Sequence, residues 1–438
     1  MLASRGYSRK NAWPLALGVI LIGTVACRPV KDAPIPVVAR ADVENTPDVI
    51  NAAAFHGSWE GTLGEPLGYW LRFDCFASGG IDKVLVSISS EDRIFHFIPV
   101  DFEQTGKALR LWMNDEANRV LINLQFNHDG QLAGEFSQYG RSAIGIFNRV
   151  SGTPTDGEYH IKGFEKTVEL LHGSSNFKRD DANTVVFQYE YDNPKLTELR
   201  NNFDLITIAG SGDTQSKAIK LLNWLCKGTR HYGNYDNHVE QNSLALLEYS
   251  YNQGAEKGLN CYNLSIILSE MCLSLGIQAR ALALMPKNPN DFDYHVVVMA
   301  WTPENGKWIM LDPSFNSYFQ DANGNVLSPM ELRNGIADGE FSALNPDAKI
   351  DYMEYVNYLA KDLYYFLSIQ KTSFGAFSGS NQLIYLCPNG FDLVDWKIRN
   401  MRFRNSFNNQ TENDLAKREE AIRQEKYIFA TSESFWGK

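Results

Sequence analysis

Two neighbouring stretches decide the fold of this 438-residue chain: GLNCYNLSIILSEMCLSLGIQARALAL at residues 258–284 and HVVVMAWTPENGKWIMLDP at residues 295–313. In the first, apolar residues recur at three- and four-residue intervals from Leu264 to Leu275, a pattern typical of a helix with one buried face. Asn260 is a favourable residue for the start of that helix, and Gly276 is favourable for its end. The alternating residues that follow predict a strand.

The second stretch predicts two antiparallel strands joined by a turn at residues 304–307. If Trp301 pairs with Trp308 across that turn, Asp312 lies on the same sheet face as His295, one diagonal step away. A two-residue Asn-Gly turn would move the two side chains a further pair apart. We therefore predict the longer loop, which leaves the carboxylate within reach of the imidazole.

Cys261 occupies the first turn of the predicted helix. Unpaired amides and the positive end of the helix dipole at that position favour the thiolate over the thiol. A thiolate, an imidazole at the start of one strand (His295) and a carboxylate at the end of the next (Asp312) are a nucleophile, a base and the group that orients the base. The pattern predicts catalysis by a cysteine nucleophile.

The same residues resemble the core of the transglutaminase-like superfamily, over about residues 202–315. The resemblance is carried by the Gly-Leu-Asn-Cys261 sequence, the Leu-Gly-Ile-Gln-Ala-Arg280 segment, His295 with its valine run, and the Trp-Ile-Met-Leu-Asp312-Pro segment. It implies a papain-like catalytic domain that transfers acyl groups through a thioester. In that domain Cys261 is the nucleophile, His295 the general base and acid, and Asp312 the orienting carboxylate.

Such chemistry needs an oxyanion site, which we expect to include the backbone amide of Cys261. Trp224 and Asn242 are candidates for the second donor. We expect Arg280 to brace the helix and strand rather than to touch substrate. Three residues that neighbour the proposed nucleophile and base are further candidates for substrate contacts: Asn260, Asp293 and Tyr294.

Before this region, short alternating runs with turn signals predict a small antiparallel β-barrel over residues 53–151. Its opening sequence Gly-Ser-Trp-Glu-Gly, residues 57–61, resembles the start of lipocalin-like domains. The barrel could bind a ligand or dock substrate, or it could be a packing module with a filled interior. We therefore expect an α+β protein: the barrel, a catalytic domain with its N-terminal extension at residues 155–400, and a C-terminal helical tail at residues 401–438.

Basic residues precede a short apolar stretch at residues 13–26, which ends in Thr-Val-Ala-Cys27 and resembles the lipobox of bacterial lipoproteins. We expect a signal peptide at residues 1–27, a lipid on Cys27, and a proline-bearing tether at residues 28–52. The protein would then lie in the cell envelope, anchored to a membrane surface outside the cytoplasm. A plain cleaved signal or an uncleaved anchor is the alternative.

The formal net charge of -11 disfavours nucleic acid as a partner. The cysteines beyond Cys27 are odd in number, so at least one thiol should be free. They form no Cys-x-x-Cys motif and no Cys/His cluster at ligand spacing, so we expect no metal and no cofactor.

Three functions remain open for a peptide or protein partner. Water could attack the thioester, which would make the protein a cysteine peptidase or amidase. A lysine amine could attack instead, which would make it a protein-glutamine crosslinking enzyme. The fold could also serve as a non-catalytic peptide- or glycan-binding lipoprotein. A complete Cys, His and Asp set disfavours the binding module, and no dedicated amine tunnel or calcium loop is evident, so hydrolysis is favoured.

Overall fold

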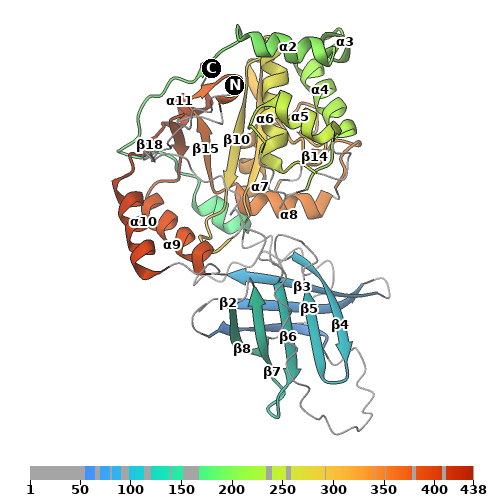
Figure 1. The fold of residues 1–438 in the computed structure, drawn as a ribbon, viewed down its shortest axis with the longest axis vertical. Coiled ribbons are helices and arrows are strands. Elements are labelled where there is room, and N and C mark those ends of the chain that lie inside the picture. The colour runs from blue at the N-terminus through green and yellow to red at the C-terminus, as the bar shows by residue number, and fades with distance from the viewer. Residues whose placement is uncertain are drawn as a thin grey trace, which may run out of the picture.

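A computed structural model gives the arrangement of the chain (Figure 1). It describes residues 55–64, 70–78, 81–89, 98–112, 120–138, 141–150, 167–232, 239–252, 258–291, 293–340, 342–350, 352–376, 381–406 and 411–437. The expected signal peptide, Cys27 and the tether lie outside these ranges. None of the helices in the described ranges is long and apolar enough to cross a bilayer.

The N-terminal part is a closed barrel of eight strands, each paired antiparallel with the next and the last paired with the first, so the predicted barrel is confirmed. The strands are β1 (Gly57–Leu63), β2 (Trp70–Ser78), β3 (Ile81–Ser89), β4 (Ile98–Thr105), β5 (Ala108–Trp112), β6 (Val120–Phe126), β7 (Leu132–Gln138) and β8 (Arg141–Val150).

Side chains fill the barrel interior. Trp59 of the opening motif is 1% exposed, and its indole nitrogen donates a hydrogen bond to the carbonyl of Phe55 at 2.9 Å. Gly61 allows β8 to approach closely, because a Cβ at this position would lie 2.0 Å from the carbonyl oxygen of Ile146. The buried interior side chains include Leu71, Phe73, Val84, Leu109, Leu111, Ile122, Leu124, Leu132, Phe136 and Phe147. This packing favours the packing module over a barrel with an internal ligand.

The second part is built on a six-stranded sheet in the order β12-β11-β10-β15-β17-β18. Its strands are β10 (Ala279–Met285), β11 (His295–Thr302), β12 (Lys307–Leu311), β15 (Tyr365–Ile369), β17 (Leu383–Leu386) and β18 (Ile428–Phe429). Trp301 pairs with Trp308, which confirms the predicted register and the longer loop. All neighbouring strands run antiparallel except β17 and β18.

Helices cover both faces of this sheet. Successive side chains of a strand point to opposite sides, so each strand packs against both helical layers. Val298 and Ala300 of β11 pack with the helices on one face, and Val297 and Met299 pack with those on the other. The first face holds α2 (Pro194–Asn202), α3 (Leu205–Ala209), α4 (Thr214–Gly228), α5 (Ser243–Asn252) and α6 (Cys261–Ser274). The second holds α7 (Pro329–Ala337), α8 (Tyr352–Asp362) and the helical residues 167–173.

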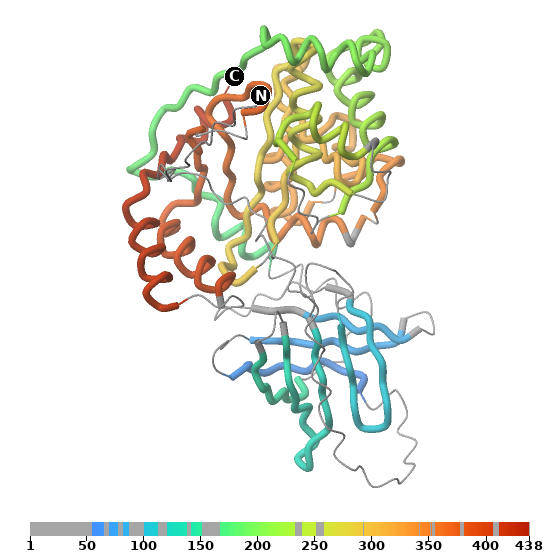
Figure 2. Tube along the Cα trace, in the orientation of Figure 1, coloured from blue at the N-terminus to red at the C-terminus, as the bar shows by residue number. Residues whose placement is uncertain are grey.

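The segment before α2 and the C-terminal segment each contribute a short strand. Before α2, residues 188–189 form the two-residue strand β9 (Gln188–Tyr189), and an extended segment runs along the outer edge beside β18 (Figure 2). At the C-terminus, α9 (Leu393–Ser406) and α10 (Glu412–Gln424) are helical as expected, and α10 buries only Leu415. However, β18 completes the central sheet and α11 (Ser432–Trp436) buries Phe435, so the last residues are not a solvated tail.

Arg280 contacts these chain ends rather than the helix it was expected to brace. Its side chain is fully buried and donates hydrogen bonds to the hydroxyl of Tyr189, at 2.9 Å, and to the carbonyl of Phe435. Its guanidinium lies 3.6 Å from the ring centre of Phe187. Arg280 therefore joins the middle of the sheet to the segments that precede α2 and follow α10.

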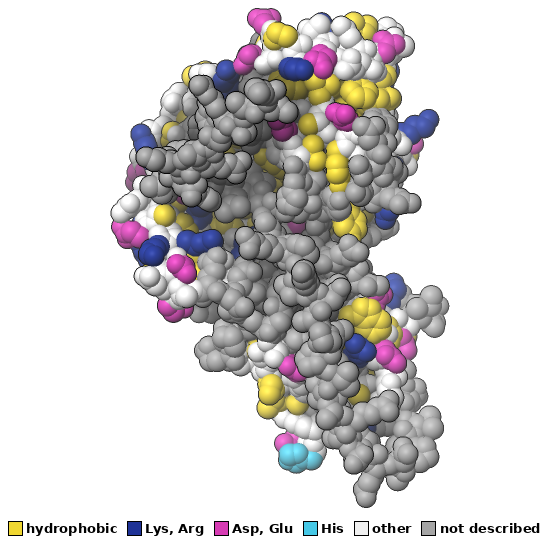
Figure 3. All heavy atoms as spheres, viewed as in Figure 1, with side chains coloured by type: hydrophobic (Ala, Val, Ile, Leu, Met, Phe, Trp, Pro, Cys, Tyr) yellow, Lys and Arg dark blue, Asp and Glu magenta, His cyan; other side chains and the backbone are white. Residues whose placement is uncertain are grey.

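Charged side chains of both signs are interspersed on the face shown in Figure 3. Lys and Arg gather near α9 and α10, where ion pairs such as Lys397 with Glu425, at 2.7 Å, join the two helices.

Candidate active site

Helix α6 begins at Cys261, as the sequence predicts. The side chain of Asn260 accepts a hydrogen bond from the amide of Asn263 at 2.9 Å, and the Asn263 side chain accepts one in return from the amide of Asn260 at 3.2 Å. This reciprocal cap satisfies two amides of the first turn. Among the cysteines of the described residues, Cys261 is partly exposed and the others are buried. Cys261 is therefore the cysteine of the described residues that solvent reaches in part.

A hydrogen bond holds the start of α6 against the start of β11. The hydroxyl of Ser265, one turn after Cys261, donates to the carbonyl of Val296 at 3.0 Å. Because Val296 follows His295 directly, this bond brings the thiol and the imidazole to the same end of the sheet. Cys261 lies close enough to His295 to help raise the pKa of the imidazole.

His295 and Asp312 form a fully buried pair. Nε2 of His295 lies 2.6 Å from Oδ2 of Asp312, and neither side chain is exposed. Asp312 directly follows β12 and starts a tight loop in which its amide donates to the carbonyl of Ser317 at 2.8 Å. The structure thus brings together the carboxylate and the imidazole that the hairpin register predicts.

Asp312 has two further donors. The amide of Ser314 donates to Oδ1 at 2.8 Å, and the hydroxyl of Tyr355 donates to Oδ2 at 2.5 Å. Burial alone would raise the pKa of Asp312, but the charge and hydrogen bond of His295, with those two donors, outweigh it and lower the pKa. Asp312 is therefore held as a carboxylate.

The other nitrogen of His295 faces a second tyrosine. The hydroxyl of Tyr358 lies 3.2 Å from Nδ1, and the Phe315 ring lies 5.9 Å from the imidazole centre to centre. Burial disfavours the charged imidazole and by itself would lower the pKa of His295. The charge and hydrogen bond of Asp312, with a contribution from Cys261, raise the pKa by more than burial lowers it. The pKa of His295 therefore lies well above its usual value of 6.5. This arrangement favours an imidazolium beside the thiol.

The sequence reasoning missed Tyr355 and Tyr358. Both lie on α8, three residues apart, so their side chains share one face of the helix. That spacing indicates in the sequence only that the two rings share a helix face, and not what they contact. It missed His231 as well, whose ring lies 5.3 Å from that of Phe315 and whose pKa burial lowers to about 4.

The two candidates for the second oxyanion donor have other contacts. The ring of Trp224 packs against Phe203, with ring centres 5.7 Å apart, in the core of the helical face. The side chain of Asn242 accepts from the amide of Ala245 at 2.9 Å, at the start of α5, and donates to Glu240 at 3.2 Å. The contacts of Trp224 and Asn242 do not identify either as the second donor.

Asp293 and Tyr294 precede His295 directly. Tyr294 is partly buried, and its burial together with the nearby Cys261 raises the pKa of its hydroxyl despite the charge of Arg404. Asp293 is half exposed, with a carboxylate oxygen 3.8 Å from Nζ of Lys361. In the described parts of the chain, no three His, Cys, Asp or Glu side chains are grouped so as to hold a metal ion.

Comparisons with known proteins agree with this geometry. Residues 205–313 match the family model of the transglutaminase-like superfamily, and this range contains Cys261, His295 and Asp312. No curated protein matches the chain.

Two solved structures are similar to parts of the chain. One is a candidate cysteine protease from Cytophaga hutchinsonii, at 13% identity and a TM-score of 0.21, which covers 46% of this chain and 68% of that one. The other is a candidate protease from Parabacteroides distasonis, at 11% identity and a TM-score of 0.19, which covers 45% of this chain and 40% of that one. TM-scores this low say nothing about the activity of this chain.

Proposed function

Because residues 205–313 form a transglutaminase-like domain, we propose that this protein is a cysteine-dependent acyl-transfer enzyme that hydrolyses peptide or amide bonds. The observation that carries the proposal is the buried contact of 2.6 Å between His295 and Asp312, with Cys261 near enough to act on the same imidazole. A nucleophile, a base and the group that orients the base are the set that acyl transfer requires.

In the first half of the reaction, the Cys261 thiolate attacks the carbonyl carbon of the substrate and forms a tetrahedral oxyanion. The amide of Cys261 at the start of α6 is a suitable donor to that oxyanion. The carbon–nitrogen bond then breaks, His295 gives its proton to the leaving amine, and a thioester remains. In the second half, His295 takes a proton from water, the hydroxide attacks the thioester, and the acid leaves as the thiolate is restored.

Labelling with a thiol-reactive electrophile tests the nucleophile. We expect wild-type protein to be labelled at Cys261 and the Cys261→Ser variant to lose that label. Cys226→Ser is the matched control, because Cys226 is buried, burial raises the pKa of its thiol to about 12, and its sulfur donates to the carbonyl of Pro313. Equal labelling of wild type and Cys261→Ser would eliminate the assignment.

A glutamine peptide with an excess of a primary amine separates hydrolysis from crosslinking. Release of ammonia without incorporation of the amine supports hydrolysis, and incorporation of the amine supports a transferase. Digestion of a peptide library by the purified protein would then identify the sequences that it cleaves.

We further propose that the enzyme acts outside the cytoplasm, anchored to a membrane surface by a lipid on Cys27. The proposal rests on the basic and apolar N-terminal sequence and its Thr-Val-Ala-Cys27 ending. Mass spectrometry of the mature N-terminus tests it, since we expect a lipid-modified Cys27 as the first residue. A mature protein that begins at an unmodified Arg28 would contradict the anchor.

A further inference from the structure

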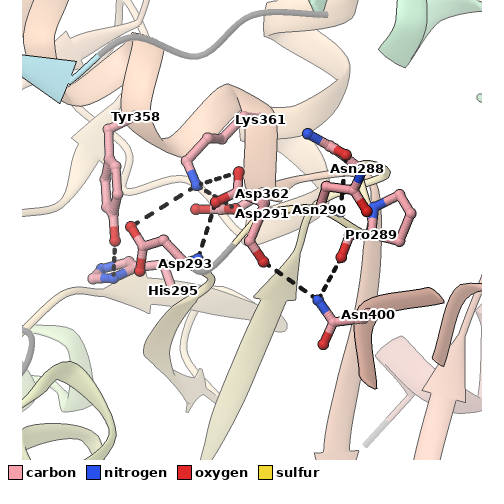
Figure 4. Close-up of polar contacts among 10 residues, drawn as sticks. All are labelled: Asn288, Pro289, Asn290, Asp291, Asp293, His295, Tyr358, Lys361, Asp362 and Asn400. Atoms are coloured by element: carbon pink, nitrogen blue, oxygen red, sulfur yellow. Dashed lines mark hydrogen bonds and ion pairs between the residues drawn. The ribbon is translucent and has the colours of Figure 1, made fainter. Parts of the chain in front are cut away.

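Four charged side chains lie together directly beside His295. Lys361, on α8, places its Nζ 3.0 Å from Asp291 and 3.3 Å from Asp362, and 3.8 Å from Asp293 (Figure 4). Lys361 is nearly buried, whereas the Asp293 side chain is 50% exposed. The ammonium therefore ties the loop before His295 to α8.

Tyr358 lies between this group and the imidazole. It is one turn before Lys361 on α8, and the Lys361 ammonium lies 5.5 Å from the centre of its ring. The Tyr358 hydroxyl faces Nδ1 of His295 (Figure 4), and the Asp293 carboxylate lies near enough for its charge to act on the same hydroxyl. Burial, with the charge of Asp293, raises the pKa of Tyr358 well above its usual value, so the hydroxyl keeps its proton.

We propose that Tyr358 and Asp293 form a second positioning chain on His295, in addition to the direct contact with Asp312. The inference rests on the proposed function and deepens it. The Tyr358 proton is donated to the Asp293 carboxylate, so the hydroxyl oxygen presents a lone pair to the Nδ1 proton of the imidazolium. The ring is then held at both nitrogens by hydrogen bonds that lead to carboxylates.

This arrangement has two consequences for the reaction. A rotation of the imidazole would break hydrogen bonds at both ends, so the ring keeps its orientation. A hydroxyl held as an acceptor also stabilises the imidazolium over the neutral ring. Tyr358 and Asp293 act through His295, and they are therefore positioning residues.

Several titratable groups face His295, and a change in its titration must be separated from their effects. They are Cys261 at the start of α6, His231 in the segment before α5, Asp312 after β12, Tyr355, Tyr358 and Asp362 on α8, and Asp293 in the preceding loop. A double-mutant comparison isolates the two residues of the proposed chain, because the other groups are the same in every variant.

The experiment is an NMR titration of the full-length protein with labelled imidazole carbons. The chain has 8 His, and the His295 signal is the one missing from His295→Asn. We expect Tyr358→Phe to lower the His295 midpoint by about one pH unit, as loss of a hydrogen bond to a charged group implies. Asp293→Asn should lower the midpoint when Tyr358 is present and leave it unchanged in the Tyr358→Phe background.

Tyr352→Phe is the matched control, because it removes a hydroxyl from the same helix at a ring that packs on Phe319. Any one of three results would overturn the chain. The midpoint could be unchanged in Tyr358→Phe, it could shift equally in Tyr352→Phe, or Asp293→Asn could shift it by the same amount in both backgrounds. The readout needs no turnover. Failure of the proposed function would look different. The protein would then show no Cys261-dependent hydrolysis, while the titration of His295 would still depend on Tyr358.

Discussion

Nε2 of His295 lies 2.6 Å from Oδ2 of Asp312, and both side chains are completely buried. A buried charge is costly unless it is paired, and removal of one partner of such a pair typically costs about 3–5 kcal/mol. Here the carboxylate also accepts hydrogen bonds from Ser314 and Tyr355. The pair is thus supported from a loop and from α8, and it sets the protonation state of the imidazole.

Replacement of Asp312 by asparagine tests how that state affects activity. In this variant the carboxylate no longer raises the pKa of His295, and burial of the ring then lowers that pKa. The alkaline limb of kcat/KM should therefore move to lower pH. We also expect kcat/KM to fall by about 10²- to 10⁴-fold, as when the orienting carboxylate of other triads is neutralised. The measurement is a pH profile of peptide hydrolysis.

Asp338→Asn is the control for that change, because Asp338 is exposed at the end of α7. It should leave both the rate and the profile unchanged. An Asp312→Asn variant whose alkaline limb stays at the wild-type pH would contradict the role of Asp312.

Tyr355→Phe should make the protein more sensitive to acid. The folded-state pKa of Asp312 is lowered, so its contribution to stability is present above the unfolded value of 3.8 and is lost as the pH falls through the folded value. Removal of the Tyr355 donor raises the folded value toward the unfolded one, so Asp312 contributes less stability and the protein has less to lose before it unfolds in acid. We expect a cost of about 1–3 kcal/mol at neutral pH, measured by urea unfolding, and an acid transition shifted upward. An acid transition at the wild-type pH would count against this.

The hairpin and the helix start could be predicted because their determinants are local. The pairing of Trp301 with Trp308 fixes the position of Asp312, and the Asn260 cap fixes that of Cys261. Tyr355 and Tyr358 could not be predicted, since their contact with the pair depends on how α8 docks on the sheet. For the same reason, nothing in the sequence near β18 showed that it would join the central sheet.

Helix α9 offers a test of how the loop before His295 is held. The Asn400 side chain donates to the carbonyl of Pro289 at 2.7 Å and to that of Asp291 at 3.3 Å (Figure 4). We expect Asn400→Ala to reduce hydrolysis severalfold, while the free energy of unfolding falls by only about 1 kcal/mol. The exposed Asn334→Ala on α7 is the control. Activity equal to wild type would show that this loop needs no support from α9.

The C-terminal segment should contribute to stability rather than act as a loose tail. Phe435 is completely buried, and its ring lies 5.6 Å from that of Phe187, with Arg280 bound to its carbonyl. Phe435→Ala should cost about 3–5 kcal/mol, measured by urea unfolding. The neighbouring exposed Glu433→Ala should change stability by less than about 0.5 kcal/mol. Similar values for the two variants would mean that the segment packs weakly.

Glu270 should make the stability depend on pH near neutrality. It is buried on α6 and accepts hydrogen bonds from the amide and hydroxyl of Ser243, at 2.8 and 2.5 Å, and from the amide of Gly375 at 2.9 Å. Burial nevertheless raises the pKa of Glu270 from 4.5 to about 7. A carboxyl group whose pKa is raised on folding contributes stability below its unfolded value, and this is lost as the pH rises through the folded value.

Glu270→Gln removes that titration and is therefore the test. Relative to this variant, wild type should lose up to about 1.4 kcal/mol of unfolding free energy per pH unit as the pH rises from about 4.5 to about 7. Urea unfolding at several pH values measures the difference between the two proteins. The exposed Glu340→Gln should differ from wild type by a constant amount over the same range. A constant difference for Glu270→Gln as well would mean that the Glu270 pKa is not raised on folding.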